Sequence, residues 1–335
     1  MGEGGTPLVE SLRIGPKLSG VRLAFKLELS NPTGSYKDRF IAAELEHLLA
    51  RGVRLCVATS SGNTGSSLAA YCARHAVACA IVVNADAPAG KLLPMEAHGA
   101  RLLRVPGFAS SAEVTEAVFA DLRELAAGGR AALVVSAFRF CPVGMEGVKT
   151  IARELQAQAP GVDHVFVPVG GGGLFAAVSA EMRRIRPGTR VHAVQPNGCP
   201  TVLNAVRLSK TVESVESATR ISGLSVPFDI DASLAVRLLR EGGGEAFGVD
   251  DGEVFAAQRE MLREEGIYCE PAGAAALAGA RRAVAQGVVK PGEQCVCLVT
   301  GHGSKDTDSI RRHIAAPGAP VEPGGVKRAL AEWMS

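Results

Sequence analysis

A lysine at the start of a helix is the first residue whose position suggests covalent chemistry. Residues 31–40 read NPTGSYKDRF, and Asn31 to Ser35 are turn-forming and helix-capping residues in a row. The run KDRFIAAELEHLLARG, which begins at Lys37, has apolar residues at helical spacing and ends on Gly52. The Lys37 amine is therefore held near the first turn of a helix. It is either an ordinary solvated lysine or an amine placed to form a Schiff base.

A second group of polar residues follows the apolar run LCVAT at residues 55–59. SSGNTGSSLAAY places hydroxyl and amide side chains where a strand ends and a helix begins, and the backbone N–H groups of a helix N-terminus bind anions. The candidate ligands of a carboxylate or phosphate are Ser60, Ser61, Asn63 and Thr64. A simple capped turn without a ligand explains this stretch equally well.

Four consecutive glycines, Gly170–Gly173, join the apolar run HVFVPV to the helical run LFAAVSAEMRRI. Glycines at such a turn let the backbone wrap around a phosphate. With Ala176 they also fit the G-x-G-x-x-A spacing of a dinucleotide site. That site requires an acidic residue at the end of the next strand, where this chain has Gln195. We therefore expect a phosphate cup rather than an NAD site, with a flexible loop as the remaining alternative.

A third polar turn follows the apolar run CVCLVT, which ends at Thr300. If this run is a buried strand, the Thr300 hydroxyl faces the same crevice as the two other turns. The next residues, GHGSKD, include His302 and Lys305. These two side chains either contact a ligand or belong to a solvated loop.

The three turns depend on an alternation of short apolar runs and helical stretches. Strands buried on both faces are predicted over residues 55–59, 78–84, 101–106, 132–137, 164–169, 190–196 and 295–300. Helices are predicted over residues 64–76, 111–127, 144–158 and 174–186. This alternation predicts an α/β fold whose mostly parallel sheets carry helices on both faces.

Composition restricts the classes of function. The 335-residue chain has a formal net charge of +2 and only 4% aromatic residues, so we expect no nucleic-acid partner. No uninterrupted apolar run reaches membrane-spanning length, and the start MGEGGTPLVESLRIG lacks the pattern of a signal peptide. None of the eight cysteines forms a CxxC pair with zinc spacing, and Cys295 and Cys297 alternate in QCVCLVT like small buried residues. We expect a cytoplasmic protein without a metal site or a membrane partner.

Taken together, the motifs resemble those of the fold type II pyridoxal-phosphate enzymes, also called the tryptophan synthase β-like family. The matching stretches, in chain order, are GGTPL, NPTGSYKDR, SSGNTG, EGVKTIARE, VPVGGGGL, EPAGAAALAG and VTGHGSKD. They extend from about residue 4 to about residue 308. One such stretch alone is a weak signal, whereas seven in the same order are a specific one.

The resemblance implies a role for each turn. Lys37 forms the Schiff base with pyridoxal 5'-phosphate, Asn63 binds the 3′ oxygen of this cofactor, and Thr300 faces its pyridine nitrogen. The cofactor phosphate is held by Gly170, Gly171, Gly172, Gly173 and Leu174. The substrate carboxylate is held by Ser61, Gly62, Asn63 and Thr64. Residues expected behind this layer are Ser60, Arg139, Glu270 and His302.

The chemistry of the cofactor agrees with these residue types. The cofactor needs a lysine, a phosphate cup and a polar group near its ring nitrogen. A neutral hydroxyl at Thr300 makes the ring a weaker electron sink than a carboxylate would. That suits loss of the α-proton coupled to departure of a β-substituent. Lys37, once released by the substrate, is the natural base for the α-proton.

Within the family, NPTGSYKDR, EGVKTIARE and TGHGSKD look most like threonine synthase. The segment before EGVKT departs from that branch, where N-S-x-N-P-Y-R usually helps to bind the substrate phosphate. Phe138, Arg139 and Gly144 stand here in place of its Asn, Ser and Arg. If Phe138 and Phe140 line the pocket, Arg139 points away from it. The glycine cup looks more like that of serine or threonine dehydratases, and SSGNTG like that of cysteine synthase.

We therefore expect a pyridoxal-phosphate-dependent lyase or synthase that acts on a small amino acid. The expected reaction is β-elimination or β-replacement on serine, threonine or an O-activated serine, through an aminoacrylate intermediate. Two alternatives remain open. One is a true threonine synthase that acts on O-phosphohomoserine, and the other is a binding protein that retains the cofactor without turnover.

The resemblance also implies two domains, each with an open, mostly parallel twisted sheet flanked by helices, and a cofactor in the cleft between them. We expect residues 46–137 to form the smaller domain, and residues 1–45 and 138–325 the larger one, followed by a tail at 326–335. Residues 315–325 are rich in proline and glycine and are expected to extend over the surface. The resemblance implies a homodimer.

Overall fold

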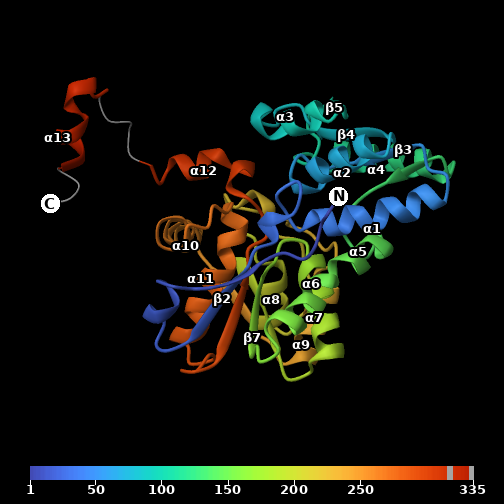
Figure 1. Ribbon diagram of the computed structural model, residues 1–335. Coiled ribbons are helices and arrows are strands. Elements are labelled where there is room, and N and C mark those ends of the chain that lie inside the picture. Colours follow the sequence, from blue (N-terminus) through green and yellow to red (C-terminus); the bar gives the residue numbers. More distant parts are fainter. Residues whose placement is uncertain (315–319, 332–335) are drawn as a thin grey trace.

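The computed structural model describes residues 1–314 and 320–331 and has two open, mostly parallel sheets flanked by helices (Figure 1). The strands are β1 (Leu8–Glu10), β2 (Arg22–Lys26), β3 (Leu55–Ala58), β4 (Ala78–Asn84), β5 (Arg101–Val105), β6 (Ala131–Leu133), β7 (His164–Pro168), β8 (Arg190–Pro196), β9 (Ala246–Val249) and β10 (Gln294–Leu298). The helices are α1 (Lys37–Ala50), α2 (Asn63–Arg74), α3 (Ala89–Ala97), α4 (Ala112–Ala127), α5 (Pro142–Val148), α6 (Thr150–Gln158), α7 (Gly173–Ile185), α8 (Thr201–Arg207), α9 (Ala232–Gly242), α10 (Asp251–Glu264), α11 (Pro271–Ala285), α12 (Thr307–Arg311) and α13 (Val326–Ala331).

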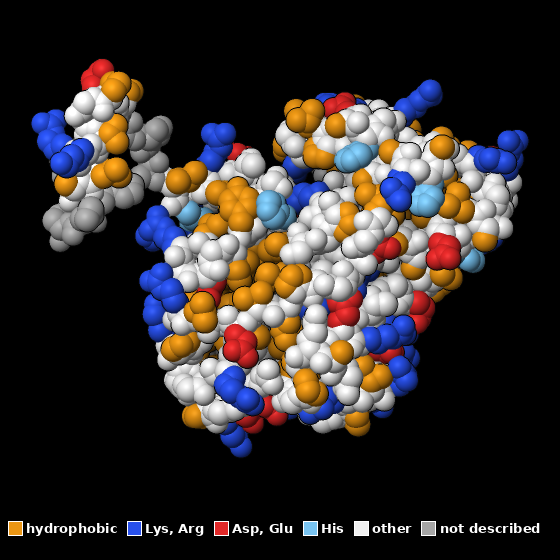
Figure 2. Space-filling model, in the orientation of Figure 1, with side chains coloured by type: hydrophobic (Ala, Val, Ile, Leu, Met, Phe, Trp, Pro, Cys, Tyr) orange, Lys and Arg blue, Asp and Glu red, His pale blue; other side chains and the backbone are white. Residues whose placement is uncertain are grey.

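The larger sheet has six strands in the order β1-β2-β10-β7-β8-β9. All neighbouring strands in it are parallel except β1 and β2. All five residues of β7 are buried, as expected for a central strand that is covered on both faces. In Figure 2, which has the same orientation as Figure 1, apolar side chains gather on the visible face over α11, and charged side chains lie around them.

The smaller sheet has four parallel strands in the order β5-β4-β3-β6. The prediction that every strand is buried on both faces is wrong for β5, because β5 lies at an edge of this sheet. Leu103 in its middle is 51% exposed, and Arg101 and Arg104 flank it with charge, as is common on edge strands. We propose that residues 46–137, which contain this sheet, form a domain of their own.

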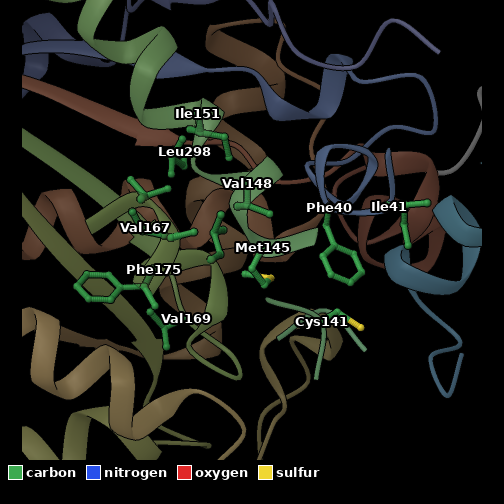
Figure 3. Close-up of a cluster of buried hydrophobic side chains, with 14 of the residues drawn as sticks. Phe40, Ile41, Cys141, Met145, Val148, Ile151, Val167, Val169, Phe175 and Leu298 are labelled. Carbon is green, nitrogen blue, oxygen red and sulfur yellow. The ribbon is translucent and has the colours of Figure 1, made fainter. Parts of the chain in front are cut away.

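One hydrophobic core joins the two sheets through α1 and α5. Figure 3 shows Phe40 of α1 facing Met145 and Val148 of α5, with Phe175 of α7 beyond them. The two helices pack this closely because α5 contains glycines, at positions 144 and 147. A Cβ at position 144 would lie 2.6 Å from the Phe40 ring, and one at 147 would collide with the backbone of residue 39. The helix expected over 144–158 is broken at residue 149, where α5 ends and α6 begins.

An ion-pair network holds the amino-terminal residues against the start of α1. The Arg39 guanidinium donates to Glu28 Oε1 at 2.8 Å and to Glu154 Oε2 at 2.8 Å, and Lys26 Nζ donates to the Thr6 carbonyl at 2.7 Å. Burial raises the pKa of Glu154, but hydrogen bonds from Arg39 and Lys26 bring it down to about 2. A cavity of about 660 Å³ beside this network is lined by Glu154 and Arg39 but not by Lys37.

The remaining elements extend past the sheets. Figure 1 shows α13 apart from both sheets, and none of its residues is buried. The tail predicted at 326–335 thus begins as a helix, while residues 315–319 and 332–335 lie outside the described part of the chain. Within the described ranges, none of the helices combines the length and the apolar composition that crossing a bilayer requires.

Candidate active site

Lys37 is the first residue of α1 and directly follows the NPTGSY turn. Its Nζ donates a hydrogen bond to Ser136 Oγ at 2.8 Å and lies 4.7 Å from the centre of the Tyr36 ring. Ser136 comes after β6, so the amine reaches from α1 to the carboxyl end of the smaller sheet. The side chain is half-buried, unlike that of a solvated surface lysine.

Asp38 fixes the turn in front of Lys37. Its buried carboxylate accepts hydrogen bonds from Thr33 N at 2.6 Å, Thr33 Oγ1 at 2.6 Å and Ser67 Oγ at 2.5 Å. Burial raises the pKa of Asp38, whereas the hydrogen bonds from Ser67 and Thr33 lower it. Because Thr33 lies in the turn and Ser67 in α2, one carboxylate fixes the backbone that positions Lys37.

The turn before Lys37 packs against the loop that follows β10. Ser35 forms an isolated β-bridge with Gly301, and Tyr36 N donates to the Thr300 carbonyl at 3.1 Å. Thr300 is only 4% exposed. Ser35 Oγ is buried and has no hydrogen-bond partner among the described residues. A polar atom buried in this way is costly unless a further group satisfies it.

The glycine cup, residues 170–173, joins β7 to α7. Gly172 has a φ of +96°, and a Cβ there would lie 2.6 Å from the Asp231 carbonyl oxygen, so only glycine fits. The N–H groups of Gly173, Leu174 and Phe175 begin the 13-residue helix α7 and have no acceptor within the helix. Together with the positive end of the helix dipole they form a site for an anion.

A hydrogen bond between Asn63 and Glu270 links the two sheet layers. Asn63 Nδ2 donates to Glu270 Oε1 at 2.8 Å, from the first residue of α2 to the residue that precedes α11. Glu270 N in turn donates to the Gly301 carbonyl at 3.0 Å, next to Thr300. Burial raises the pKa of Glu270 to about 7, although the hydrogen bond from Asn63 and the nearby Lys305 lower it.

The residues expected to hold the substrate carboxylate lie between β3 and α2. Gly62 N donates to Ser60 Oγ at 3.3 Å, and Asn63 and Thr64 are the first two residues of α2. Ser61 is half-buried in the same turn. The turn therefore places hydroxyl groups beside the unpaired N–H groups of a 12-residue helix, a suitable environment for a carboxylate.

His302 and Lys305 differ in their surroundings. His302 Nδ1 lies 2.8 Å from Ser304 Oγ, and burial lowers the pKa of His302. Lys305 Nζ donates to Ser66 Oγ of α2 at 2.8 Å, so this lysine ties the loop after β10 to the smaller-sheet layer instead of lying in solvent. Burial lowers the pKa of Lys305, while Glu270 and Asp38 raise it.

The β6–α5 loop, residues 134–141, carries the segment that departs from threonine synthases. The Arg139 side chain is exposed. Phe138 lies under Lys149, whose Nζ is 5.8 Å from the ring centre, and the exposed Phe140 ring is 6.5 Å from that of Phe119 in α4. The two phenylalanines therefore contact different elements and do not form one pocket wall.

Two residues of this region were missed in the sequence analysis. Ser136 lies in ALVVSA, which predicts only a strand, although the strand ends at Leu133 and leaves the hydroxyl in a loop. Asp231 precedes α9, a helix that was not predicted. The sequence does contain the signals of this helix, because ASLAVRLLREG has apolar residues at helical spacing and is followed by Gly243, whose φ is +66°. The structure also places strands over 8–10, 22–26 and 246–249, where none was predicted.

Comparison with known proteins shows the family of the chain. The model of the family described as "Pyridoxal-phosphate dependent enzyme" matches residues 1–301. The chain belongs to this family. Threonine synthase of Methanocaldococcus jannaschii is 32% identical over 333 residues, or 94% of this chain and 78% of the relative. Threonine synthase of Mycobacterium tuberculosis is 32% identical over 340 residues, or 98% of this chain and 89% of the relative.

Solved structures show the same fold at lower identity. O-ureido-L-serine synthase superposes with a TM-score of 0.80 at 22% identity, covering 95% of each chain. Maize serine racemase has a TM-score of 0.76 at 21% identity and covers 98% of this chain and 94% of its own. The protein is thus a fold type II pyridoxal-phosphate enzyme, as its motifs predict.

The residues present fit this cofactor. The glycine cup would hold its phosphate, Lys37 would carry it, and the buried hydroxyls of Ser35 and Thr300 would meet its polar edge. When bound, the cofactor supplies an electron sink for the electrons of the α-carbon.

Gln195 does not support a nucleotide site. It is 1% exposed and its side chain is hydrogen-bonded to Thr201 Oγ1 and Leu203 N, so it does not present an acceptor to a nucleotide ribose. The described residues hold no metal-binding cluster of three or more His, Cys, Asp or Glu.

Proposed function

We propose that this enzyme catalyses β-elimination or β-replacement on a small amino acid such as serine, threonine or an O-activated serine. In elimination, the α-proton and the β-substituent leave, and water then converts the unsaturated product to a keto acid and ammonia. In replacement, a nucleophile adds where the β-substituent left.

The roles of the side chains follow from their contacts. Lys37 Nζ takes the α-proton, and its hydrogen bond to Ser136 Oγ keeps the amine on one side of the site. The substrate carboxylate binds at the turn of Ser61 and Thr64, where hydroxyls and helix N–H groups are available. Thr300 would present a neutral hydroxyl to the ring of a bound cofactor, which would leave the ring a weaker electron sink than a carboxylate would. A weaker sink favours proton loss that is coupled to departure of the β-substituent.

The packing at Gly144 is the main support for a substrate without a phosphate group. Threonine synthases usually have an arginine at this position, where it helps to bind the substrate phosphate. Here a Cβ would lie 2.6 Å from the Phe40 ring and 2.8 Å from Glu44 Cβ, and Gly144 N donates to Glu44 Oε2 at 2.8 Å. The space for a side chain is filled by α1. Arg139 remains in this segment, but its side chain is exposed to solvent.

Threonine synthase itself is the second candidate function. Relatives with that name are 31–33% identical to this chain over more than 90% of its length. On this hypothesis the substrate phosphate would bind to groups other than the usual Asn, Ser and Arg. The amine of Lys37 would serve proton transfer in this γ-chemistry as well.

A substrate panel separates the two hypotheses. O-phosphohomoserine, O-phosphoserine, O-acetylserine, serine and threonine are each assayed for phosphate or acetate, ammonia and keto acid, with and without added nucleophiles. We expect serine, threonine or O-acetylserine to have the highest kcat/KM. Threonine formation from O-phosphohomoserine with the highest kcat/KM would establish the second candidate. Absorbance changes without any product would indicate a protein that retains the cofactor without turnover.

A further inference from the structure

Asp231 places a buried carboxylate between the glycine cup and the β6–α5 loop. It directly precedes α9 and is only 4% exposed. Its Oδ2 accepts a hydrogen bond from Phe138 N at 2.7 Å, and its Oδ1 accepts one from Arg139 N at 3.2 Å. Its own N–H donates to the Gly171 carbonyl at 2.9 Å. Backbone and side chain are therefore both fixed.

This carboxylate lies close to the groups that act on the substrate. A Cβ built on Gly173 would be 2.9 Å from Asp231 Oδ2 and 3.5 Å from the Ser136 carbonyl oxygen. Gly173 of the glycine cup, the Asp231 carboxylate and Ser136 therefore lie close together. Ser136 also receives the hydrogen bond from Lys37. Any substituent of the substrate that extends from the α-carbon toward the β6–α5 loop approaches Asp231.

Two consecutive N–H groups that point the same way form an anion site in many proteins. In this chain the Asp231 carboxylate itself fills this anion site, because it accepts hydrogen bonds from the N–H groups of Phe138 and Arg139. These are the positions whose side chains in threonine synthases help to bind the substrate phosphate. Burial, and after it the like charge of Asp229, raise the pKa of Asp231 above its usual value, although the hydrogen bonds from Phe138 N and Arg139 N and the nearby Lys37 oppose this shift. A substrate phosphate that arrives at the β6–α5 loop finds these two donors already used and a like charge beside them, whereas the cofactor phosphate would bind the free N–H groups of the glycine cup.

We propose that Asp231 determines specificity by excluding anionic side-chain substituents, so that the enzyme selects amino acids whose β-substituent is neutral or cationic. This inference rests on the proposed function, because it names the substrate class of the same site. The repulsion is effective because the Asp231 carboxylate is buried, where charge screening is weak. A positioning role alone, in which Asp231 only holds the β6–α5 loop, would affect all ligands alike.

The test measures ligand binding and does not depend on turnover. The holoenzyme is titrated with three L-amino acids that lack a β-leaving group, and the cofactor absorbance gives each dissociation constant. The ligands are 2-amino-4-phosphonobutyrate (anionic), norvaline (neutral) and 2,4-diaminobutyrate (cationic). We expect norvaline and 2,4-diaminobutyrate to bind the wild type at least tenfold more tightly than the phosphonate. Asp231→Asn should reduce this gap to less than threefold.

Asp229→Asn is the matched control, because it removes a nearby negative charge, one that raises the pKa of Asp231, and leaves the hydrogen bonds of Asp231 to the β6–α5 loop in place. Asp229 is only partly buried, and its carboxylate accepts from Ser233 N at 3.0 Å rather than from the β6–α5 loop. We expect its preference among the three ligands to stay within twofold of the wild type. Asp231→Glu keeps the charge and should keep the tenfold gap.

Tight binding of the phosphonate to the wild type would overturn the proposal, even if Asp231→Asn fails to fold. So would an Asp231→Asn variant that weakens or strengthens all three ligands equally, since that is the signature of a positioning role. Failure of the proposed function is a separate outcome, because it would appear as absence of β-elimination in the substrate panel while this ranking of ligands is unchanged.

Discussion

Asn63 Nδ2 donates a hydrogen bond to Glu270 Oε1 at 2.8 Å, and this contact joins the N-terminus of α2 to the start of α11. It determines which way the Asn63 amide faces, because one N–H is committed to the carboxyl group. The other N–H can then donate to the cofactor oxygen that the motif implies. The same bond connects the layers of the two sheets, so it couples the orientation of the Asn63 amide to the relative position of these layers.

Glu270 gives this contact a pH dependence. Its pKa in the folded protein is raised to about 7 by burial, from an ordinary value of 4.5. Between pH 4.5 and 7 the folded state binds a proton that the unfolded state has released, so the free energy of unfolding falls as pH rises. Glu270→Gln should therefore gain stability relative to the wild type between pH 4.5 and 8, by up to about 3 kcal/mol.

Urea unfolding of both proteins across this pH range measures the difference. Glu124→Gln, which replaces an exposed carboxyl group, is the control and should run parallel to the wild type. A difference between Glu270→Gln and the wild type that does not change with pH would show that Glu270 is ionised throughout this range.

Lys37 is expected to carry the cofactor. The purified protein should be yellow, and reduction with borohydride should attach the cofactor to the peptide that contains Lys37. Lys37→Ala should abolish turnover, because the base and the covalent anchor are lost together. Lys290→Ala, at an exposed position, should retain activity and labelling. Mass spectrometry of the reduced peptide decides the matter, and a label on another lysine would refute the assignment.

Gly172 and Gly171 form a natural pair for testing the cup. A Cβ at Gly172 would meet the Asp231 carbonyl oxygen at 2.6 Å and would force a φ of +96° on alanine, which costs about 1–2 kcal/mol by itself. A Cβ at Gly171 would have its nearest neighbour at 3.6 Å, an ordinary contact. We expect Gly172→Ala to lower the melting temperature and to weaken cofactor binding at least tenfold, and Gly171→Ala to do much less. Equal cofactor affinity in Gly172→Ala and the wild type would place the phosphate elsewhere.

His192 should make the protein sensitive to acid. Burial, His164 and Arg190 lower its pKa from 6.5 to about 3. The unfolded state therefore binds more protons than the folded state between pH 3 and 6.5, and each unit of acidification in this window costs about 1.4 kcal/mol. His192→Asn should show a shallower loss of stability below pH 6.5. His98→Asn, at an exposed position, is the control, and equal slopes for all three proteins would contradict the prediction.

The sequence was sufficient for the fold class because its central strands are continuous apolar runs. Runs such as HVFVPV can only be buried, and glycine-rich turns mark where they end. The sequence was not sufficient to predict the exposure of β5 at the edge of the smaller sheet. RLLRV has the same apolar centre as a buried strand, and only the strand order shows that β5 lies at the edge of the sheet.

The same limit applies to the site. Lys37, Asn63 and the glycine cup stand in local motifs, so the sequence could indicate them as candidate site residues. Asp231 lies in no motif, and its importance depends on contacts with Phe138 and Arg139, more than 90 positions away. Contacts of this kind arise from packing between elements and leave no local pattern.

Gly144→Arg should fail to create a threonine synthase. The substitution restores the residue type usual in that branch, but its Cβ would lie 2.6 Å from the Phe40 ring and 2.8 Å from Glu44 Cβ. Overfilling a core contact typically costs about 1–3 kcal/mol, and an arginine directed into it adds a buried charge. We expect a lower melting temperature and no gain in phosphate release from O-phosphohomoserine. Val143→Arg, at a position that is 38% exposed, is the control and should fold normally. A stable Gly144→Arg protein with increased O-phosphohomoserine turnover would mean that α1 and α5 can separate to admit the side chain, and that the second candidate function lies one substitution away.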